Sequence, residues 1–93
     1  MAATLKDRLA EFDKACASVR ALTRRPTDDE LLGLYALYKQ ATVGDCNESR
    51  PMVFNLKARG KYDAWHALRG MSTEKALQSY CRYASTIVKK YSS

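Results

Sequence analysis

The chain has 93 residues, of which 46% are hydrophobic and 28% charged, and its formal net charge is +6. A chain of this size indicates one domain, and folding buries only about 60–65% of the unfolded surface, which leaves little room for an enclosed active site. With only four glycines and two prolines as turn formers, we expect a few long elements, and helices are the natural candidate.

The charge is unevenly distributed along the chain. Residues 1–25 carry six bases and three acids, residues 26–56 two bases and five acids, and residues 57–93 eight bases and two acids. Residues 57–93 therefore carry a local charge of +6, which favours an anionic partner. A basic face that is merely solvated is the alternative.

Cysteine spacing and the N-terminal segment bear on the compartment. Cys16, Cys46 and Cys81 are far apart and form no C-x-x-C pair, so we expect reduced thiols and neither a disulfide framework nor a metal site. The first residues have no apolar signal region, and no stretch approaches the roughly 18 apolar residues of a membrane span. These features predict a soluble, cytoplasmic protein.

Two helices are predicted in the first half of the chain. A single helical stripe is formed by Leu5, Leu9, Phe12, Cys16, Val19 and Leu22. This helix ends before Pro26, because the residue before a proline disfavours helical geometry. Thr27 and Glu30 form a T-x-x-E capping box, and the second helix is expected from about 28 to about 42, ending at Thr42-Val43-Gly44-Asp45.

Residues 43 to about 57 show no clear period and are expected to form a loop long enough to suggest a functional role. A third helix is predicted over roughly 58–69, with Tyr62, Trp65 and Leu68 facing inward and Gly70 ending it. Ser72 is the expected cap of a fourth helix that runs almost to the C-terminus. The fold class predicted is all-α, a four-helix bundle.

The second helix is apolar over an unusually wide arc. At 100° per residue its apolar and aromatic residues cover more than half of the circumference, whereas one core face needs little over 100°. We therefore expect this helix to contact the core through Leu34 and a second surface through Tyr35, Tyr38 and Lys39. The alternative is that both tyrosines lie at the core margin with their hydroxyls in water.

Basic residues cluster where the loop meets the third helix. Lys57, Arg59 and Lys61 lie within five positions, and such groups suit phosphate. With the tyrosines they indicate a ligand that has a stackable ring and several phosphates, either nucleic acid or a nucleotide with an apolar tail. Catalysis finds little support, because His66 is the only histidine and no carboxylate pair has acid–base spacing.

Specific motifs then connect these features. LYALYKQATVGDCN at 34–47 is followed by Arg50-Pro51, a lysine, D-A-W at 63–65, G-x-S-x-E-x-A at 70–76 and a tyrosine. This series closely resembles the acyl-CoA-binding protein family, also called diazepam-binding inhibitor. The resemblance runs from Phe12 to Tyr91, and Y-K-Q-A-T-x-G-D at 38–45 is its most specific part. It implies one acyl-CoA-binding domain over 1–93, with up-down-down-up topology.

The resemblance also implies a function without catalysis or a cofactor. The protein would bind medium- to long-chain acyl-CoA esters one to one, as a monomeric intracellular carrier and pool former that supplies acyl-CoA-using enzymes. A nucleic-acid or protein interaction module using the same basic face is the alternative. By resemblance, Tyr35, Lys39 and Lys61 would meet the CoA 3′-phosphate region and Tyr38 would stack near the adenine. The other implied contacts are Arg20, Ala36, Leu37, Lys57 and Tyr80.

An apolar groove for the acyl chain is expected between helices. Its expected lining is Met52, Val53, Leu56 and the apolar stripe of the first predicted helix. The chain departs here from the common family pattern R-P-G-M-L-D-F-K, since it reads Arg50-Pro-Met-Val-Phe-Asn-Leu-Lys57. If the bulky Met52 and Phe54 close the groove early, shorter acyl chains are preferred. If Met52 instead points to solvent, these departures are neutral.

Overall fold

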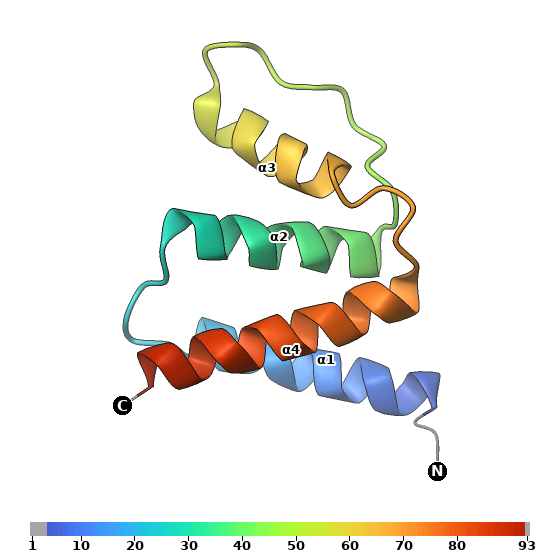
Figure 1. The fold of residues 1–93 in the computed structure, drawn as a ribbon, viewed down its shortest axis with the longest axis vertical. Coiled ribbons are helices and arrows are strands. Elements are labelled where there is room, and N and C mark those ends of the chain that lie inside the picture. The colour runs from blue at the N-terminus through green and yellow to red at the C-terminus, as the bar shows by residue number, and fades with distance from the viewer. Residues whose placement is uncertain (1–3, 93) are drawn as a thin grey trace.

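The computed structural model describes residues 4–92, which form four α-helices and contain no strand. The helices are α1 (Leu5–Arg20), α2 (Asp28–Thr42), α3 (Leu56–His66) and α4 (Thr73–Tyr91). In Figure 1, α1 and α4 run in one direction and α2 and α3 in the other, which confirms the all-α bundle with up-down-down-up topology. No helix in the described part of the chain is long and apolar enough to cross a membrane.

Side-chain caps explain where the helices begin. The Thr27 hydroxyl accepts a hydrogen bond from the Glu30 backbone N–H (3.2 Å), and the Glu30 carboxylate accepts one from the Thr27 N–H (2.9 Å). This confirms the predicted capping box and the bounds of α2. Thr4 and Asp7 form a second box at the start of α1, which the T-x-x-D spacing could have revealed.

Helix α3 is displaced from its predicted position. It was expected over roughly 58–69 but spans Leu56–His66. The Asn55 side chain accepts a hydrogen bond from the Ala58 N–H (3.3 Å) and so starts the helix two residues early. The helix ends before Gly70, and the intervening residues form a turn in which Gly70 adopts a φ of +90°.

Helix α4 supplies most of the core. It packs against α1 and α2, whereas α3 packs on the other side of α2, so that α2 lies between α3 and α4 (Figure 1). Each predicted inward position of α3 is at least partly buried, and Trp65 is only 1% exposed. The buried core cluster comprises Phe12, Cys16, Leu34, Ala41, Ala76, Leu77, Tyr80, Ala84 and Ile87.

The predicted stripe of α1 is only half buried. Phe12 and Cys16 lie in the core, but Leu5 and Leu9 are 53% and 45% exposed. Among the described helices α1 packs closely only on α4, so its first turns are covered from one side. Periodicity alone therefore overpredicted the length of the buried face.

A buried polar network joins the end of α2 to the turn before α4. Gln40 is fully buried, and its Nε2 donates to Asp45 Oδ1 (2.8 Å) and to a backbone carbonyl of that turn (3.0 Å). The Gly70 N–H also donates to Asp45 Oδ1 (2.8 Å), and Trp65 Nε1 donates to the Gly44 carbonyl (2.8 Å). The hydrogen bonds from the Gly70 N–H and from Gln40 lower the pKa of the Asp45 carboxyl. Gln40, Gly44 and Asp45 of the Y-K-Q-A-T-x-G-D motif therefore hold the fold together.

Candidate ligand-binding site

Helix α2 has two contact surfaces, as its wide apolar arc predicted. Leu34 and Ala41 belong to the core shared with α4, while Tyr35 and Lys39 face side chains of α3. Lys61 Nζ lies 5.2 Å from the centre of the Tyr35 ring, and Lys39 Nζ lies 4.7 Å from that of Trp65. Two ammonium groups are thus held over aromatic faces between α2 and α3.

A groove of about 750 Å³ runs between α2 and α3. Its lining residues are Arg25, Asp28, Leu31, Leu32, Tyr35, Leu56, Lys57, Gly60 and Lys61. The leucines provide an aliphatic wall, and Gly60 faces Leu32 without a side chain of its own; a Cβ there would lie 3.8 Å from both Leu32 methyl carbons, an ordinary contact distance. The groove is therefore apolar over part of its length and basic over the rest.

Its electrostatics favour an anion. Arg25 is paired with Asp28 across 2.9 Å, but neither Lys57 nor Lys61 forms an ion pair within residues 4–92. Burial raises the pKa of Tyr35, so its phenol stays neutral at physiological pH. Two unneutralised ammonium groups beside a neutral aromatic ring suit phosphate and an adjacent planar ring.

An aromatic cluster lies where α2 faces α1 and α4. The Phe12 ring stacks on Tyr38 with centres 5.7 Å apart and meets the edge of Tyr80 at 4.9 Å. Tyr80 is 5% exposed, and burial raises its pKa, so it is a neutral core residue. Tyr38 is 41% exposed and offers an open aromatic face at the edge of the core.

The structure divides the nine residues predicted to contact the ligand. It brings Tyr35, Lys57 and Lys61 together in the groove, with Lys39 beside them over Trp65. Tyr38 and Tyr80 lie in the aromatic cluster where α2 faces α1 and α4, and the exposed Arg20 ends α1. Ala36 and Leu37 do not line the groove: Ala36 is buried, and Leu37 packs against the core. Their role in binding stays a prediction.

The expected lining of the acyl groove needs correction. Met52 and Val53 are 66% and 74% exposed and do not line the groove, and neither does the α1 stripe; only Leu56 does. The connection between α2 and α3 passes over the outer side of α3 and does not enter between the helices (Figure 1). The sequence reading missed Leu31 and Leu32, although they lie four and three residues before Tyr35 and thus on its face of the helix.

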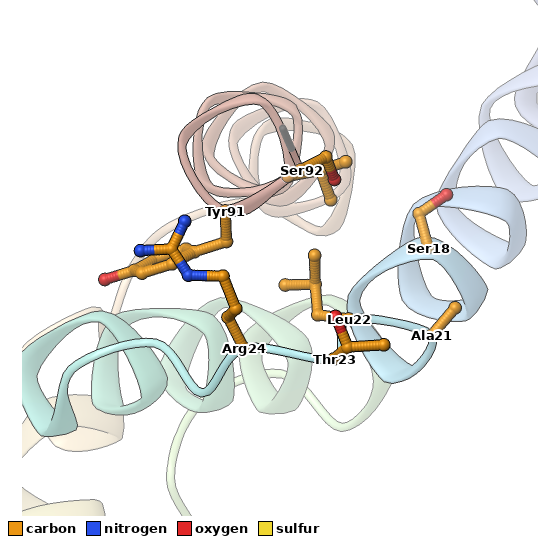
Figure 2. A pocket seen from close by; sticks show the side chains of 8 residues that line it. Ser18, Ala21, Leu22, Thr23, Arg24, Tyr91 and Ser92 are labelled. Atoms are coloured by element: carbon orange, nitrogen blue, oxygen red, sulfur yellow. The ribbon is translucent and has the colours of Figure 1, made fainter.

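A second hollow of about 600 Å³ lies where the C-terminal ends of α1 and α4 meet. Figure 2 shows its lining, with the Arg24 guanidinium beside the Tyr91 ring at 5.6 Å from the ring centre. None of the nine predicted residues lines this hollow, and Arg24 is its only charged side chain. It lacks the pair of ammonium groups that distinguishes the α2–α3 groove.

Residues 4–92 contain no cluster of three or more His, Cys, Asp or Glu side chains that could hold a metal ion. The lone His66 stacks on Tyr62 with ring centres 5.5 Å apart. A helical bundle whose groove joins an aliphatic wall to two unpaired lysines defines a binding protein for an amphiphilic anion.

Comparison with known proteins identifies the family to which this binding protein belongs. The model of the family described as acyl CoA binding protein matches residues 9–84, and the chain belongs to this family. It is 44% identical over 81 residues to the acyl-CoA-binding protein homolog of Drosophila melanogaster, an alignment that covers 87% of this chain and 94% of that protein. Acyl-CoA-binding protein 2 of Saccharomyces pastorianus is 46% identical over 82 residues, covering 88% and 94%.

Solved structures agree with the sequence comparison. The crystal structure of Oryza sativa acyl-CoA-binding protein 2 matches with a TM-score of 0.87 at 37% identity, over 92% of this chain and 94% of that one. The family predicted from Y-K-Q-A-T-x-G-D and its companion motifs is thereby confirmed.

Proposed function

We propose that this protein binds fatty acyl-CoA esters one to one and acts as a carrier and pool former without catalytic activity. The observation that carries the proposal is the α2–α3 groove, where two unpaired lysines lie beside an aliphatic wall in a chain that belongs to the acyl-CoA-binding protein family. CoA supplies clustered negative charge and a stackable ring, and the acyl chain supplies apolar surface that is best kept from water.

The two halves of the ligand are assigned to different parts of the site. Lys57, Lys61 and Lys39 are proposed to hold the phosphates, with Arg20 as a further cation. The rings of Tyr35 and Tyr38 are proposed to contact the nucleotide. The acyl chain would lie along Leu31, Leu32 and Leu56, and each buried CH₂ would contribute about 0.8 kcal/mol.

The wider role is proposed along the same lines. Residues 1–93 would act as a single acyl-CoA-binding domain, and the protein would work as a monomer in the cytoplasm and pass its ligand to acyl-CoA-using enzymes. His66 does not line the groove, and Asp28, the one carboxylate that does, is paired with Arg25. The site therefore has no evident general acid or base, which fits a carrier better than an enzyme.

Calorimetric titration with CoA, palmitoyl-CoA and free palmitate tests the proposal. We expect palmitoyl-CoA to bind far more tightly than either part, because only it uses both the lysines and the leucine wall. Equal affinities for CoA and palmitoyl-CoA would rule out the groove as an acyl site.

The comparisons give no support to the alternative of a nucleic-acid or protein interaction module. Titrations with palmitoyl-CoA and with an oligonucleotide at several salt concentrations separate that alternative. Nucleic-acid affinity would fall steeply with salt and would not depend on the presence of an acyl chain.

A further inference from the structure

The connection between α2 and α3 displays an unusual amount of apolar surface. Met52, Val53, Phe54 and Leu56 are 66%, 74%, 81% and 78% exposed, more than any other large hydrophobic residue among the described ones. Single exposed apolar residues are ordinary, but four within five positions form a patch, and patches of this kind mark interaction sites. We call these four residues the apolar tip.

The apolar tip is held in a defined shape. The Asn55 N–H donates to the Met52 carbonyl (3.0 Å), which closes a turn, and the Asn55 side chain caps α3. Just before the tip, Arg50 donates two hydrogen bonds to the Asp63 carboxylate (3.1 and 3.0 Å), which fasten the connection to α3. The apolar side chains are thus presented to the outside by an anchored turn.

Basic residues flank the apolar tip in the sequence. Residues 50–61 contain four bases and no acid, and of these only Arg50 is paired with a carboxylate. Lys57, Arg59 and Lys61 follow the tip on the first turns of α3. The connection forms one end of the molecule along its 46 Å long axis, while α1 lies at the other end (Figure 1).

We propose that the apolar tip and the three bases that follow it dock on the surface of an anionic phospholipid bilayer. Apolar side chains that enter the headgroup–acyl boundary, next to Lys and Arg that meet anionic headgroups, are the pattern by which proteins lie on membranes. Leu56 and Lys57 belong both to this surface and to the α2–α3 groove. Docking therefore places the groove beside the bilayer.

Two other occupants fit less well. A second copy of this chain would bring two clusters of unpaired bases together, and their repulsion opposes association. The acyl chain of a bound ligand cannot cover the whole tip either, because Met52, Val53 and Phe54 do not line the groove. An acidic bilayer satisfies both the apolar side chains and the charge.

Vesicle flotation of the ligand-free, full-length protein tests the docking surface. Vesicles of phosphatidylcholine alone are compared with vesicles containing about 30% phosphatidylserine, and we expect the anionic vesicles to bind at least about tenfold more protein. Val53→Ser with Phe54→Ser should reduce that binding at least about tenfold. Arg59→Gln and added salt should each weaken it several-fold.

The matched control is Leu5→Ser with Leu9→Ser, which removes two exposed apolar side chains at the other end of the molecule and should leave vesicle binding unchanged. Thermal melting confirms that each variant is folded. The proposal is overturned if the wild-type protein does not bind anionic vesicles, or if the Val53/Phe54 variant binds them as well as the wild type does. The proposal is also overturned if sedimentation velocity shows that the wild-type protein self-associates and the Val53/Phe54 variant does not, because the tip then binds a second copy of the chain.

Membrane docking itself does not depend on the proposed function. Only its purpose, to load or unload acyl-CoA at a membrane, rests on that function. Palmitoyl-CoA affinity, measured without vesicles, should change less than about twofold in the Val53/Phe54 variant, since neither residue lines the groove. A loss of this affinity with vesicle binding intact would overturn the docking surface. Vesicle binding by a wild-type protein that fails to bind palmitoyl-CoA would overturn the proposed function alone.

Discussion

At the scale of single residues, Lys39 has two roles beside the groove. Lys39 Nζ lies 4.7 Å from the centre of the Trp65 ring, and Trp65 is only 1% exposed. The ring stabilises the ammonium and holds it beside the groove. Sequence reasoning assigned Lys39 to ligand binding, and the contact with Trp65 adds a contribution to stability.

We expect Lys39→Ala to weaken palmitoyl-CoA binding by about 1–3 kcal/mol, roughly 5- to 150-fold, because a charge-assisted contact to phosphate is lost. The free energy of unfolding should fall by up to about 1 kcal/mol with the loss of the cation–π contact. Calorimetry and urea denaturation measure the two effects. Lys6→Ala, at an exposed position of α1, is the control, and equal losses at both positions would indicate diffuse attraction without a site.

Glu30 links the start of α2 to the end of α4. Its carboxylate accepts hydrogen bonds from the Tyr91 hydroxyl, the Thr27 N–H (2.9 Å) and Lys90 Nζ (2.9 Å). These contacts, with Tyr91 first, lower the pKa of Glu30 from 4.5 to about 2. Because the folded-state pKa is depressed, the stabilisation is fully present above pH 4.5 and is lost as the pH falls toward 2.

Glu30→Gln should therefore lower the melting temperature most above pH 4.5. The difference from wild type should shrink as the pH is lowered toward 2, where about half of the wild-type carboxylate is protonated. Glutamine can still serve in the capping box, so the comparison isolates the charge. If the difference in melting temperature is the same at about pH 6 as at about pH 2, the charge of Glu30 does not have this role.

At the scale of elements, α3 is the helix that shapes the groove. It packs only on α2 among the described helices, and it carries Gly60 at a helical position facing Leu32. A Cβ at this position would meet the Leu32 methyl carbons at 3.8 Å, an ordinary contact distance. Glycine in a helix interior costs about 1 kcal/mol relative to alanine, and the groove has room for an alanine side chain at this position.

Gly60→Ala should raise the free energy of unfolding by about 0.5–1 kcal/mol, measured in urea, with little effect on CoA binding. Gly60→Leu should fill the groove and lower the affinity for palmitoyl-CoA while sparing that for CoA. If Gly60→Leu binds palmitoyl-CoA as wild type does, the acyl chain does not lie between α2 and α3.

At the scale of the whole molecule, the groove and the apolar tip are separate surfaces that meet at Leu56.

The binding free energy of acyl-CoA should become more favourable by at most about 1.6 kcal/mol for each two methylenes added to the acyl chain, and this gain should stop when the groove is filled. Since Met52 is 66% exposed and does not line the groove, we expect Met52→Gly and wild type to give the same affinities from octanoyl-CoA to eicosanoyl-CoA. A longer preferred chain in Met52→Gly would show that the connection covers the groove once ligand is bound.

Local signals in the sequence determined the helices of this protein. Capping residues such as Thr27 and Ser72 act within one helical turn, and apolar periodicity depends only on the 3.6-residue repeat, so both can be read without knowing the fold. The second surface of α2 was predictable for the same reason, because an apolar arc wider than one core face has to meet something else. The family followed from Y-K-Q-A-T-x-G-D, whose spacing is a property of the chain itself.

Only the tertiary structure decided which side chains meet across helices. It placed Lys61 over Tyr35, buried Tyr80 beside Phe12, left Leu5 exposed, and carried Met52 to the outside of α3. None of these follows from local pattern, because each depends on the direction in which a loop leaves one helix and on how far two helices overlap. The sequence specifies which faces are apolar, whereas the packing of α2 between α3 and α4 determines which of those faces closes into core and which stays open as a groove.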